Sequence, residues 1–270
     1  KFDDGTSGSP LLVKEKISTE YYRKDPKSEK ELIQGFKSEG IDESFDQEGI
    51  HRFLDDVLRE VNIYDNDITI LQNRFVSPLS NIGTDFYKYY LTDTIPVDGE
   101  QCIELSFVPF TPESFGFTGR IYVPLGDSTM FVKRVKMNVA KSINLNYVEN
   151  IYMVQDFEKA DDGSRLKVKD DLMVEFRIMS SAPGMYARRI TKYKDHNLKE
   201  PESTEIFGKE GRTILAENAL SMPEKYWNDN RLIPIKRSES SVDKMLNRMR
   251  EVPAFYWVEK VVVALVSGYI

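Results

Sequence analysis

The sequence has few of the residue types from which most catalytic and metal sites are built. Its 270 residues include one cysteine, Cys102, and two histidines, His51 and His196. A single cysteine cannot form an internal disulfide, and the apolar residues that alternate around Cys102 predict a small buried strand residue. The longest apolar-rich run, residues 252–266, is broken by a proline and two charged residues. It therefore falls short of the roughly 20 apolar residues that a membrane-spanning helix requires.

Positive charge is also in deficit. The chain has 37 Lys and Arg against 44 Asp and Glu, which gives a formal net charge of −7. Its two basic clusters, residues 133–136 and 188–194, alternate charged with apolar side chains, as the solvent face of a strand does. An acidic chain without a concentrated basic face repels nucleic-acid phosphates, so nucleic acid is not an expected partner.

Two short motifs point to chemistry, and a structural interpretation is favoured for both. Residues 65–69 form an Asp-x-Asp-x-Thr string, which in haloacid-dehalogenase-like phosphatases places two carboxylates beside magnesium at the tip of a buried strand. Here the string follows an amphipathic helical pattern, which favours a polar turn. His51 and Asp55 have the i, i+4 spacing of metal ligands, but no second histidine or cysteine lies nearby to complete a zinc site. The sequence therefore assigns no catalytic residue, metal ligand or cofactor, and predicts a protein that is not an enzyme.

Alternation of apolar and polar residues dominates the chain. It predicts a half-buried strand over residues 12–23 and then seven strands joined by short turns, such as the one at Val97, Asp98 and Gly99. The seven strands are residues 86–91, 102–108, 119–125, 131–139, 147–157, 166–178 and 185–193. Short connections require antiparallel pairing, and one apolar face per strand predicts a sheet that is covered on one side. The apolar face carries the candidate residues for a hydrophobic ligand, which are Ile103, Leu105, Phe107, Leu172, Val174 and Phe176.

Helical periodicity is confined to a few segments. The strongest pattern covers residues 47–61, and weaker ones cover residues 27–38, 216–227 and 241–250. Together these elements predict an α+β fold with one large, curved antiparallel β-sheet, an open half-barrel, partly covered by a few helices. The expected organisation is a leader over residues 1–10, the curved sheet domain with its helices over residues 11–236, and a C-terminal helical segment over residues 237–270.

Several strings along the chain resemble one family. They are residues 12–18 (LVKEKIS), 62–66 (NIYDN), 75–79 (FVSPL), 87–94 (YKYYLTDT), 107–109 (FVP), 117–123 (FTGRIYV) and 226–231 (YWNDNR). With these strings the chain resembles the DUF5686 family of Bacteroidetes envelope proteins, often labelled carboxypeptidase-like regulatory domain proteins. The similarity covers about residues 11–270. The motifs are structural in character, and no peptidase residue carries over to any position of this chain.

The resemblance implies a setting in the cell envelope. Family members look like exported proteins with an N-terminal accessory β-sandwich, this middle region and a C-terminal outer-membrane β-barrel. The chain would then be a middle, periplasm-facing region of a Gram-negative outer-membrane protein, with the barrel of the same full-length protein as its partner. The expected order of elements is also similar to the half-barrels of LolA/LolB-type lipoprotein carriers, which implies a lipid, a lipopeptide or another hydrophobic peptide as ligand. A purely structural or protein-interaction scaffold, and a hydrolase whose site is assembled only by the fold, are the alternatives.

Overall fold

The computed structural model describes residues 12–40, 55, 57–139, 143, 145, 148–177, 185–199, 201 and 204–233. The chain divides into two compact units, one made of residues 1–47 with 197–270 and the other of residues 48–196. The expected boundaries near residues 10 and 236 lie outside the described residues. Each unit is described by itself below.

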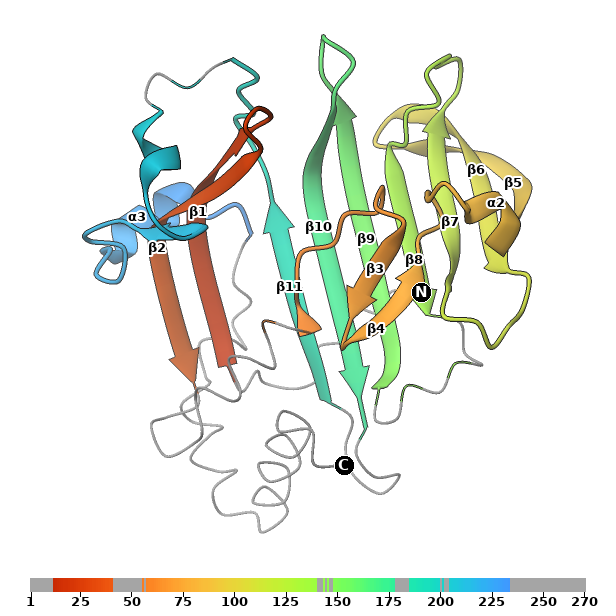
Figure 1. The fold of residues 1–270 in the computed structure, drawn as a ribbon, viewed down its shortest axis with the longest axis horizontal. Coiled ribbons are helices and arrows are strands. Elements are labelled where there is room, and N and C mark those ends of the chain that lie inside the picture. The colour runs from red at the N-terminus through yellow and green to blue at the C-terminus, as the bar shows by residue number, and fades with distance from the viewer. Residues whose placement is uncertain are drawn as a thin grey trace. The chain divides into compact units, whose positions relative to one another are not determined.

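A seven-stranded antiparallel sheet forms the larger part of unit 48–196 (Figure 1). Its strands follow one another in sequence order, so each hydrogen-bonds to the strand before and after it, with β5 and β11 at the two edges. This order confirms the seven predicted strands and their antiparallel pairing. The strands are β5 (Tyr87–Val97), β6 (Glu100–Pro109), β7 (Phe117–Pro124), β8 (Arg134–Val139), β9 (Val148–Lys159), β10 (Arg165–Phe176) and β11 (Met185–Lys192).

The predicted turns close the hairpins of this sheet. Asp98 and Gly99 connect β5 to β6 with φ angles of 49° and 83°, and Gly163 connects β9 to β10 with a φ of 82°. The two-residue turn at Asp98 and Gly99 requires this left-handed backbone, and in both connections the glycine adopts it without steric cost. The turn chemistry visible in the sequence is therefore what sets the register of these pairs.

A small hairpin lies over one face of the sheet. Strands β3 (Asp67–Ile70) and β4 (Asn73–Val76) pair with each other and not with the large sheet, and Figure 1 shows them in front of it. Their buried side chains belong to the same apolar cluster as the sheet residues beneath them. This hairpin takes the covering position that the sequence pattern predicts for helices, because four-residue strands are too short to give a recognisable period.

The helix expected over residues 47–61 lies largely outside the described residues. Asp55 and Val57 are helical, Leu58 is in a turn, and residues 59–62 have no regular structure, so the helix ends at Val57 and not at residue 61. Val57, Val61 and Ile63 are nevertheless buried in the apolar cluster. The apolar periodicity thus identifies core residues correctly but extends the helix by four positions too many.

The other unit contains a three-stranded sheet. β1 (Leu12–Arg23) pairs antiparallel with β2 (Ser28–Gly40), and β12 (Thr213–Leu215) pairs parallel with the other edge of β2. The strand expected over residues 12–23 is confirmed, whereas the helix expected over residues 27–38 is wrong, because that segment is β2. A 3-10 turn, η1 (Glu205–Gly208), and a short helix, α3 (Glu224–Asn230), complete the described part.

Helices form a minor part of the described chain. Of the segment 216–227, only the last residues join α3, while the segment 241–250 lies outside the described residues. Unit 48–196 has one further single-turn helix, α2 (Gly83–Phe86). None of the helices in the described ranges has the length and apolar character needed to cross a bilayer. The described fold is thus mostly β, with one large antiparallel sheet and a few short helices.

Candidate functional site

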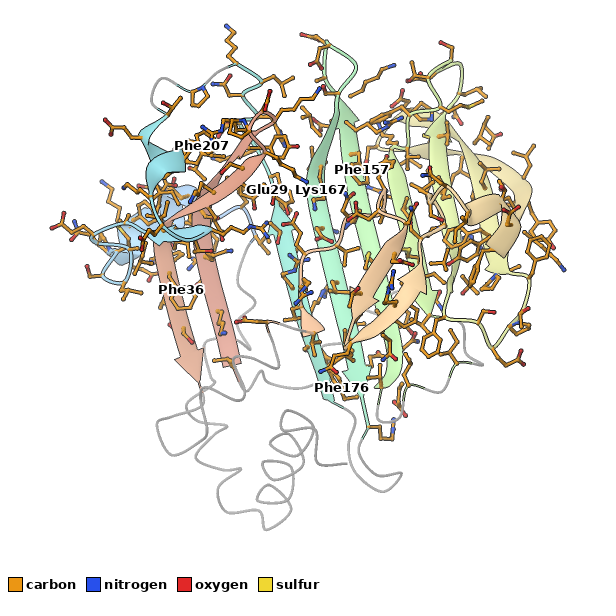
Figure 2. All side chains as sticks on the ribbon, in the orientation of Figure 1. Glu29, Phe36, Phe157, Lys167, Phe176 and Phe207 are labelled. Atoms are coloured by element: carbon orange, nitrogen blue, oxygen red, sulfur yellow. The ribbon has the colours of Figure 1, made fainter. Side chains whose placement is uncertain are left out.

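Four of the six residues proposed to contact a hydrophobic ligand are buried in the protein. Phe107, Leu172 and Val174 have no exposed surface, and Phe176 is 7% exposed. All four belong to the apolar cluster beneath the β3–β4 hairpin, and Figure 2 shows Phe176 near the end of β10. Alternation along β10 therefore identifies the buried face correctly, whereas on β6 Cys102 and Glu104 of the other face are buried more completely than Ile103 and Leu105. The four buried candidates pack against other residues of the same chain.

Aromatic side chains hold the hairpin on the sheet. Phe75 of β4 is fully buried, and its ring centroid lies 5.1 Å from that of Phe117 and 5.5 Å from that of Phe115. Separations of 4.5–7 Å with tilted or edge-on rings are favourable for aromatic pairs. The Tyr87 hydroxyl donates a hydrogen bond to the Val76 carbonyl and accepts one from the Phe117 amide. The hairpin is thus attached to the sheet by both apolar and polar contacts.

The apolar face is less completely covered where β5 and β6 form the edge of the sheet. Ile103 and Leu105, the two remaining ligand candidates, are only half-buried. Leu91 lies directly opposite Leu105 across the strand pair and is 72% exposed. Directly opposite residues of an antiparallel pair share one face. The edge thus presents a row of accessible apolar side chains that continues the buried face.

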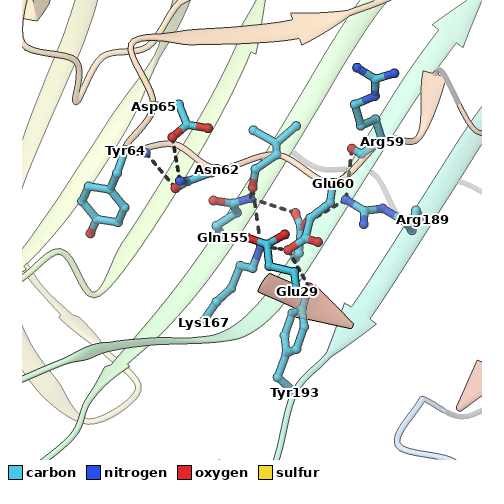
Figure 3. A network of polar contacts seen from close by, with 12 residues as sticks. Glu29, Arg59, Glu60, Asn62, Tyr64, Asp65, Gln155, Lys167, Arg189 and Tyr193 are labelled. Atoms are coloured by element: carbon cyan, nitrogen blue, oxygen red, sulfur yellow. Dashed lines mark hydrogen bonds and ion pairs between the residues drawn. The ribbon is translucent and has the colours of Figure 1, made fainter. Parts of the chain in front are cut away.

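A buried polar cluster interrupts the apolar face on β9, β10 and β11 (Figure 3). Gln155 is 1% exposed, and its Nε2 donates to the Val61 carbonyl at 2.8 Å and to Asp170 Oδ1 at 3.2 Å. Arg189 donates to the other oxygen of Asp170 at 2.7 Å. We call Gln155, Asp170 and Arg189 the Gln155 cluster. It ties the irregular segment after Val57 to the centre of the sheet.

Burial dominates the electrostatics of this cluster. Asp170 is fully enclosed, and burial raises the pKa of its carboxyl, while the nearby charges of Arg189 and Lys167 and the hydrogen bond from Gln155 act in the opposite direction. The Gln155 Oε1 atom is buried and has no hydrogen-bond partner among the described residues. Since Nε2 faces two acceptors, exchanging the two amide atoms would worsen the hydrogen bonding.

An ion pair extends the polar contacts toward the surface. Lys167 Nζ lies 2.6 Å from Glu60 Oε1, and the Tyr193 hydroxyl donates to the same oxygen at 3.4 Å (Figure 3). The Lys167 ammonium lies 5.4 Å from the centre of the Tyr193 ring. These contacts hold Glu60 against β10 and the end of β11. Their chemistry is that of a structural attachment, since each charge has an opposite partner.

Neighbouring carboxylates in the sequence diverge in space. Asp170 points into the apolar face, whereas Asp171 points to the other face, where Arg188 binds both of its oxygens at 2.9 Å. Lys169 lies 3.4 Å from the same carboxylate. Adjacent strand residues point to opposite sides of a sheet, so the two acids cannot work as one acid/base pair.

The Asp-x-Asp-x-Thr string forms a turn and the start of β3. The Asp65 carboxylate accepts a hydrogen bond from Asn62 Nδ2 at 2.9 Å, while Asp67 forms an ion pair with Arg74 across the β3–β4 hairpin. The polar-turn interpretation is thus confirmed. Within the described ranges, no three histidine, cysteine or carboxylate side chains gather as a possible metal site.

The single cysteine is a core residue of β6, and His196, the histidine that the structure describes, lies after the end of β11. Cys102 is fully buried with Val97 and Tyr122, and burial is the main cause of the raised pKa of its thiol. A raised thiol pKa lowers the thiolate fraction, as expected of a structural residue. The imidazole Nε2 of His196 lies 3.1 Å from the Lys167 carbonyl oxygen, and His51 is outside the described residues.

The Gln155 cluster is a feature that the sequence pattern did not reveal. Gln155 on β9 and Asp170 on β10 point to the apolar face of the sheet. The sequence-based assignment of that face used only the apolar residues of each strand, so these two polar residues were not part of it. A usable signal exists, because polar residues at core positions of adjacent strands are expected to hydrogen-bond to one another. The pairing register that brings them together could not be read from either strand alone.

Comparison with known proteins identifies a family for the chain but no individual protein or structure that is similar to it. No curated protein and no solved structure gives a significant match to the chain. Residues 2–194 match the group described as "Family of unknown function (DUF5686)". The match includes all of the large sheet and omits residues 195–270, to which the resemblance was expected to extend. Because it covers well over half of the sequence, the chain belongs to the DUF5686 family.

Proposed function

We propose that this chain is a non-enzymatic, periplasm-facing module of an outer-membrane-associated protein in a Gram-negative bacterium. In this proposal the module acts as a structural or protein-interaction scaffold, and its partner is the C-terminal outer-membrane barrel of the same full-length protein. The cellular setting is supported by the envelope character of the family that the sequence resembles. The scaffold role is supported by the packing of the sheet.

One observation carries the scaffold role: the apolar face is filled by the chain itself. Phe107, Leu172 and Val174 have no exposed surface, and Phe75 of the hairpin is equally buried. A preformed site for a hydrophobic ligand needs apolar side chains that line an accessible concavity. Since the central candidates are enclosed, the large sheet supports a rigid platform better than an acyl-chain carrier.

Native mass spectrometry tests this proposal directly. The protein is mixed with palmitate and, separately, with a tripalmitoylated lipopeptide, over a range of ligand concentrations. We expect no saturable one-to-one adduct with either probe, because ligand entry would have to displace the hairpin. A saturable stoichiometric adduct that survives mild activation would overturn the scaffold role.

A second candidate function is favoured by the exposed edge of the sheet. Leu91 is 72% exposed next to the half-buried Ile103 and Leu105, so a hydrophobic peptide or acyl chain would find its apolar contacts there. The open half-barrel and the analogy with LolA/LolB-type carriers, both expected from the sequence, are part of this second proposal. If the lipopeptide binds, Leu91→Asn should weaken binding about tenfold, since it removes one large apolar contact. Leu125→Asn is the matched control, because Leu125 is also exposed, at 59%, but follows the end of β7.

A further inference from the structure

Strands β7 and β8 place two cationic side chains opposite each other. Arg120 and Lys136 are direct partners in the antiparallel register. Their sequence neighbours Ile121 and Val135 are buried in the apolar cluster, so both cations point to the face away from the β3–β4 hairpin. Like charges directly opposite in a sheet repel each other.

Nearby carboxylates neutralise only part of this positive charge. Arg120 is 58% exposed, and its Nε lies 3.4 Å from a Glu104 oxygen. Arg120 also acts on the Tyr122 hydroxyl through a side-chain hydrogen bond, and its 58% exposure leaves part of the guanidinium accessible. Lys136 lies over the Tyr122 ring, 5.6 Å from its centre, and forms no ion pair within the described part of the chain. A ring face attracts an ammonium but carries no net charge to neutralise it.

The surroundings of Lys136 are themselves positive. Its pKa is lowered, first by burial and then by the charge of Arg134, with Asp156 opposing and Arg120 adding to the effect. Arg134 is itself engaged, because its guanidinium binds both oxygens of Asp156, at 2.5 and 3.0 Å. Asp156 is therefore hydrogen-bonded to Arg134, and Lys136 is left without an ion pair of its own among the described residues, although the charges of Asp156 and Glu104 both act to raise its pKa.

Hydrogen-bond donors lie beside the two cations. Thr118 and Asn138 form the pair two positions along the same two strands, on the same face, and both are half-buried. The Asn138 amide donates to the Val139 carbonyl at 3.1 Å, which leaves its second N–H available. Arg120, Lys136, Thr118 and Asn138 thus form a compact group, which we call the cation block.

We propose that the cation block binds a phosphate group, either free or as part of a lipid headgroup. A tetrahedral oxyanion offers several acceptor oxygens at once, which suits a guanidinium fork, an ammonium and two neutral donors. A bound phosphate also removes the repulsion between Arg120 and Lys136. Glu104 limits the affinity, since its carboxylate remains near the guanidinium.

Nuclear magnetic resonance titration of the whole chain tests the proposal. Inorganic phosphate is added at pH 7.5 against sodium chloride of equal ionic strength. We expect saturable shifts of the backbone amides around Thr118, Arg120, Lys136 and Asn138. Cosedimentation with vesicles of phosphatidylglycerol in phosphatidylcholine, compared with pure phosphatidylcholine, identifies the source. Binding to the anionic vesicles as well as to phosphate indicates a headgroup, and binding to phosphate alone indicates a soluble ligand.

Variants decide whether the cation block is responsible. The double variant Arg120→Gln with Lys136→Gln should bind phosphate at least about tenfold more weakly, since both cations are lost. Lys136→Glu should abolish binding while remaining folded, because it places a carboxylate opposite Arg120. Lys169→Gln is the matched control, since Lys169 lies on the same face but is paired with Asp171. No saturable binding of either probe, or equal binding by the wild type and the double variant, would overturn the proposal.

Discussion

Replacing Phe75 by alanine tests whether the β3–β4 hairpin is held on the sheet as the structure indicates. Phe75 has no exposed surface, and its ring contacts those of Phe115 and Phe117. Truncation of a fully buried phenylalanine costs about 3–5 kcal/mol, from lost transfer free energy and from the cavity that remains. A two-stranded hairpin is marginally stable by itself, so its contacts with the sheet should decide whether it stays in place.

The assay must report on unit 48–196. Both tryptophans, Trp227 and Trp257, lie outside this unit, so tryptophan fluorescence would follow the wrong part of the chain. Hydrogen exchange of the β8–β10 amides therefore reports the stability of this unit, and urea unfolding followed by far-UV circular dichroism reports that of the whole chain. Phe110→Ala is the matched control, because Phe110 is 51% exposed and should cost about 1 kcal/mol or less. Equal losses for Phe75→Ala and Phe110→Ala would refute the assignment of the hairpin as a cover.

Three further predictions concern stability. Gly119→Ala should lose about 1–3 kcal/mol in urea unfolding, because a Cβ there would lie 2.2 Å from the Lys136 carbonyl oxygen; an unchanged midpoint would contradict this close approach. Gln72→Gly should gain about 1 kcal/mol, since Gln72 has a φ of 62° in the β3–β4 turn; a loss would contradict it. Burial raises the folded-state pKa of Asp170 above its ordinary value of 3.8, so this carboxyl contributes stability at low pH that is lost as the pH rises through the raised pKa. Wild type should therefore gain stability relative to Asp170→Asn between pH 7 and pH 4, and a pH-independent difference in unfolding free energy would contradict this assignment.

The large sheet could be predicted because its local signals agree. Each strand alternates apolar and polar residues, and turns such as the one at Asp98 and Gly99 carry residues that tolerate a positive φ. Sequential hairpins require no long-range pairing rule, so the order of strands followed from the sequence order. The predicted strand ends differ from the observed ones by a few residues, as is usual for element boundaries.

Strand β2 could not be predicted for a physical reason that its register shows. The pairing with β1 shifts between Ile17 and Ser18, where Gln34 is an extra residue on β2. The apolar residues Leu32, Ile33 and Phe36 have a sequence spacing that imitates one face of a helix. The segment is also rich in glutamate and lysine, which favour helices. Pairing with β1 and β12 overrides that local preference.

The hairpin and the Gln155 cluster were missed for a related reason. The β3–β4 turn is made by Leu71 and Gln72, neither of which signals a turn in sequence, although both have positive φ angles. The cluster depends on which residues of β9, β10 and the segment near Val61 come together. Local patterns identify faces and periods, whereas contacts between distant segments depend on packing that a single sequence does not display.

The parallel pairing of β12 with β2 determines the order in which the two sheets become complete as the chain emerges into the compartment where it folds. Residues 48–196 are contiguous, so the large sheet has all of its strands once residue 192 has emerged. The three-stranded sheet lacks its third member until Thr213–Leu215 has been made, although its first strand begins at residue 12. Between the end of β2 at Gly40 and the start of β12 at Thr213 lie about 170 residues, so we expect the three-stranded sheet to be the last to reach its final hydrogen bonding.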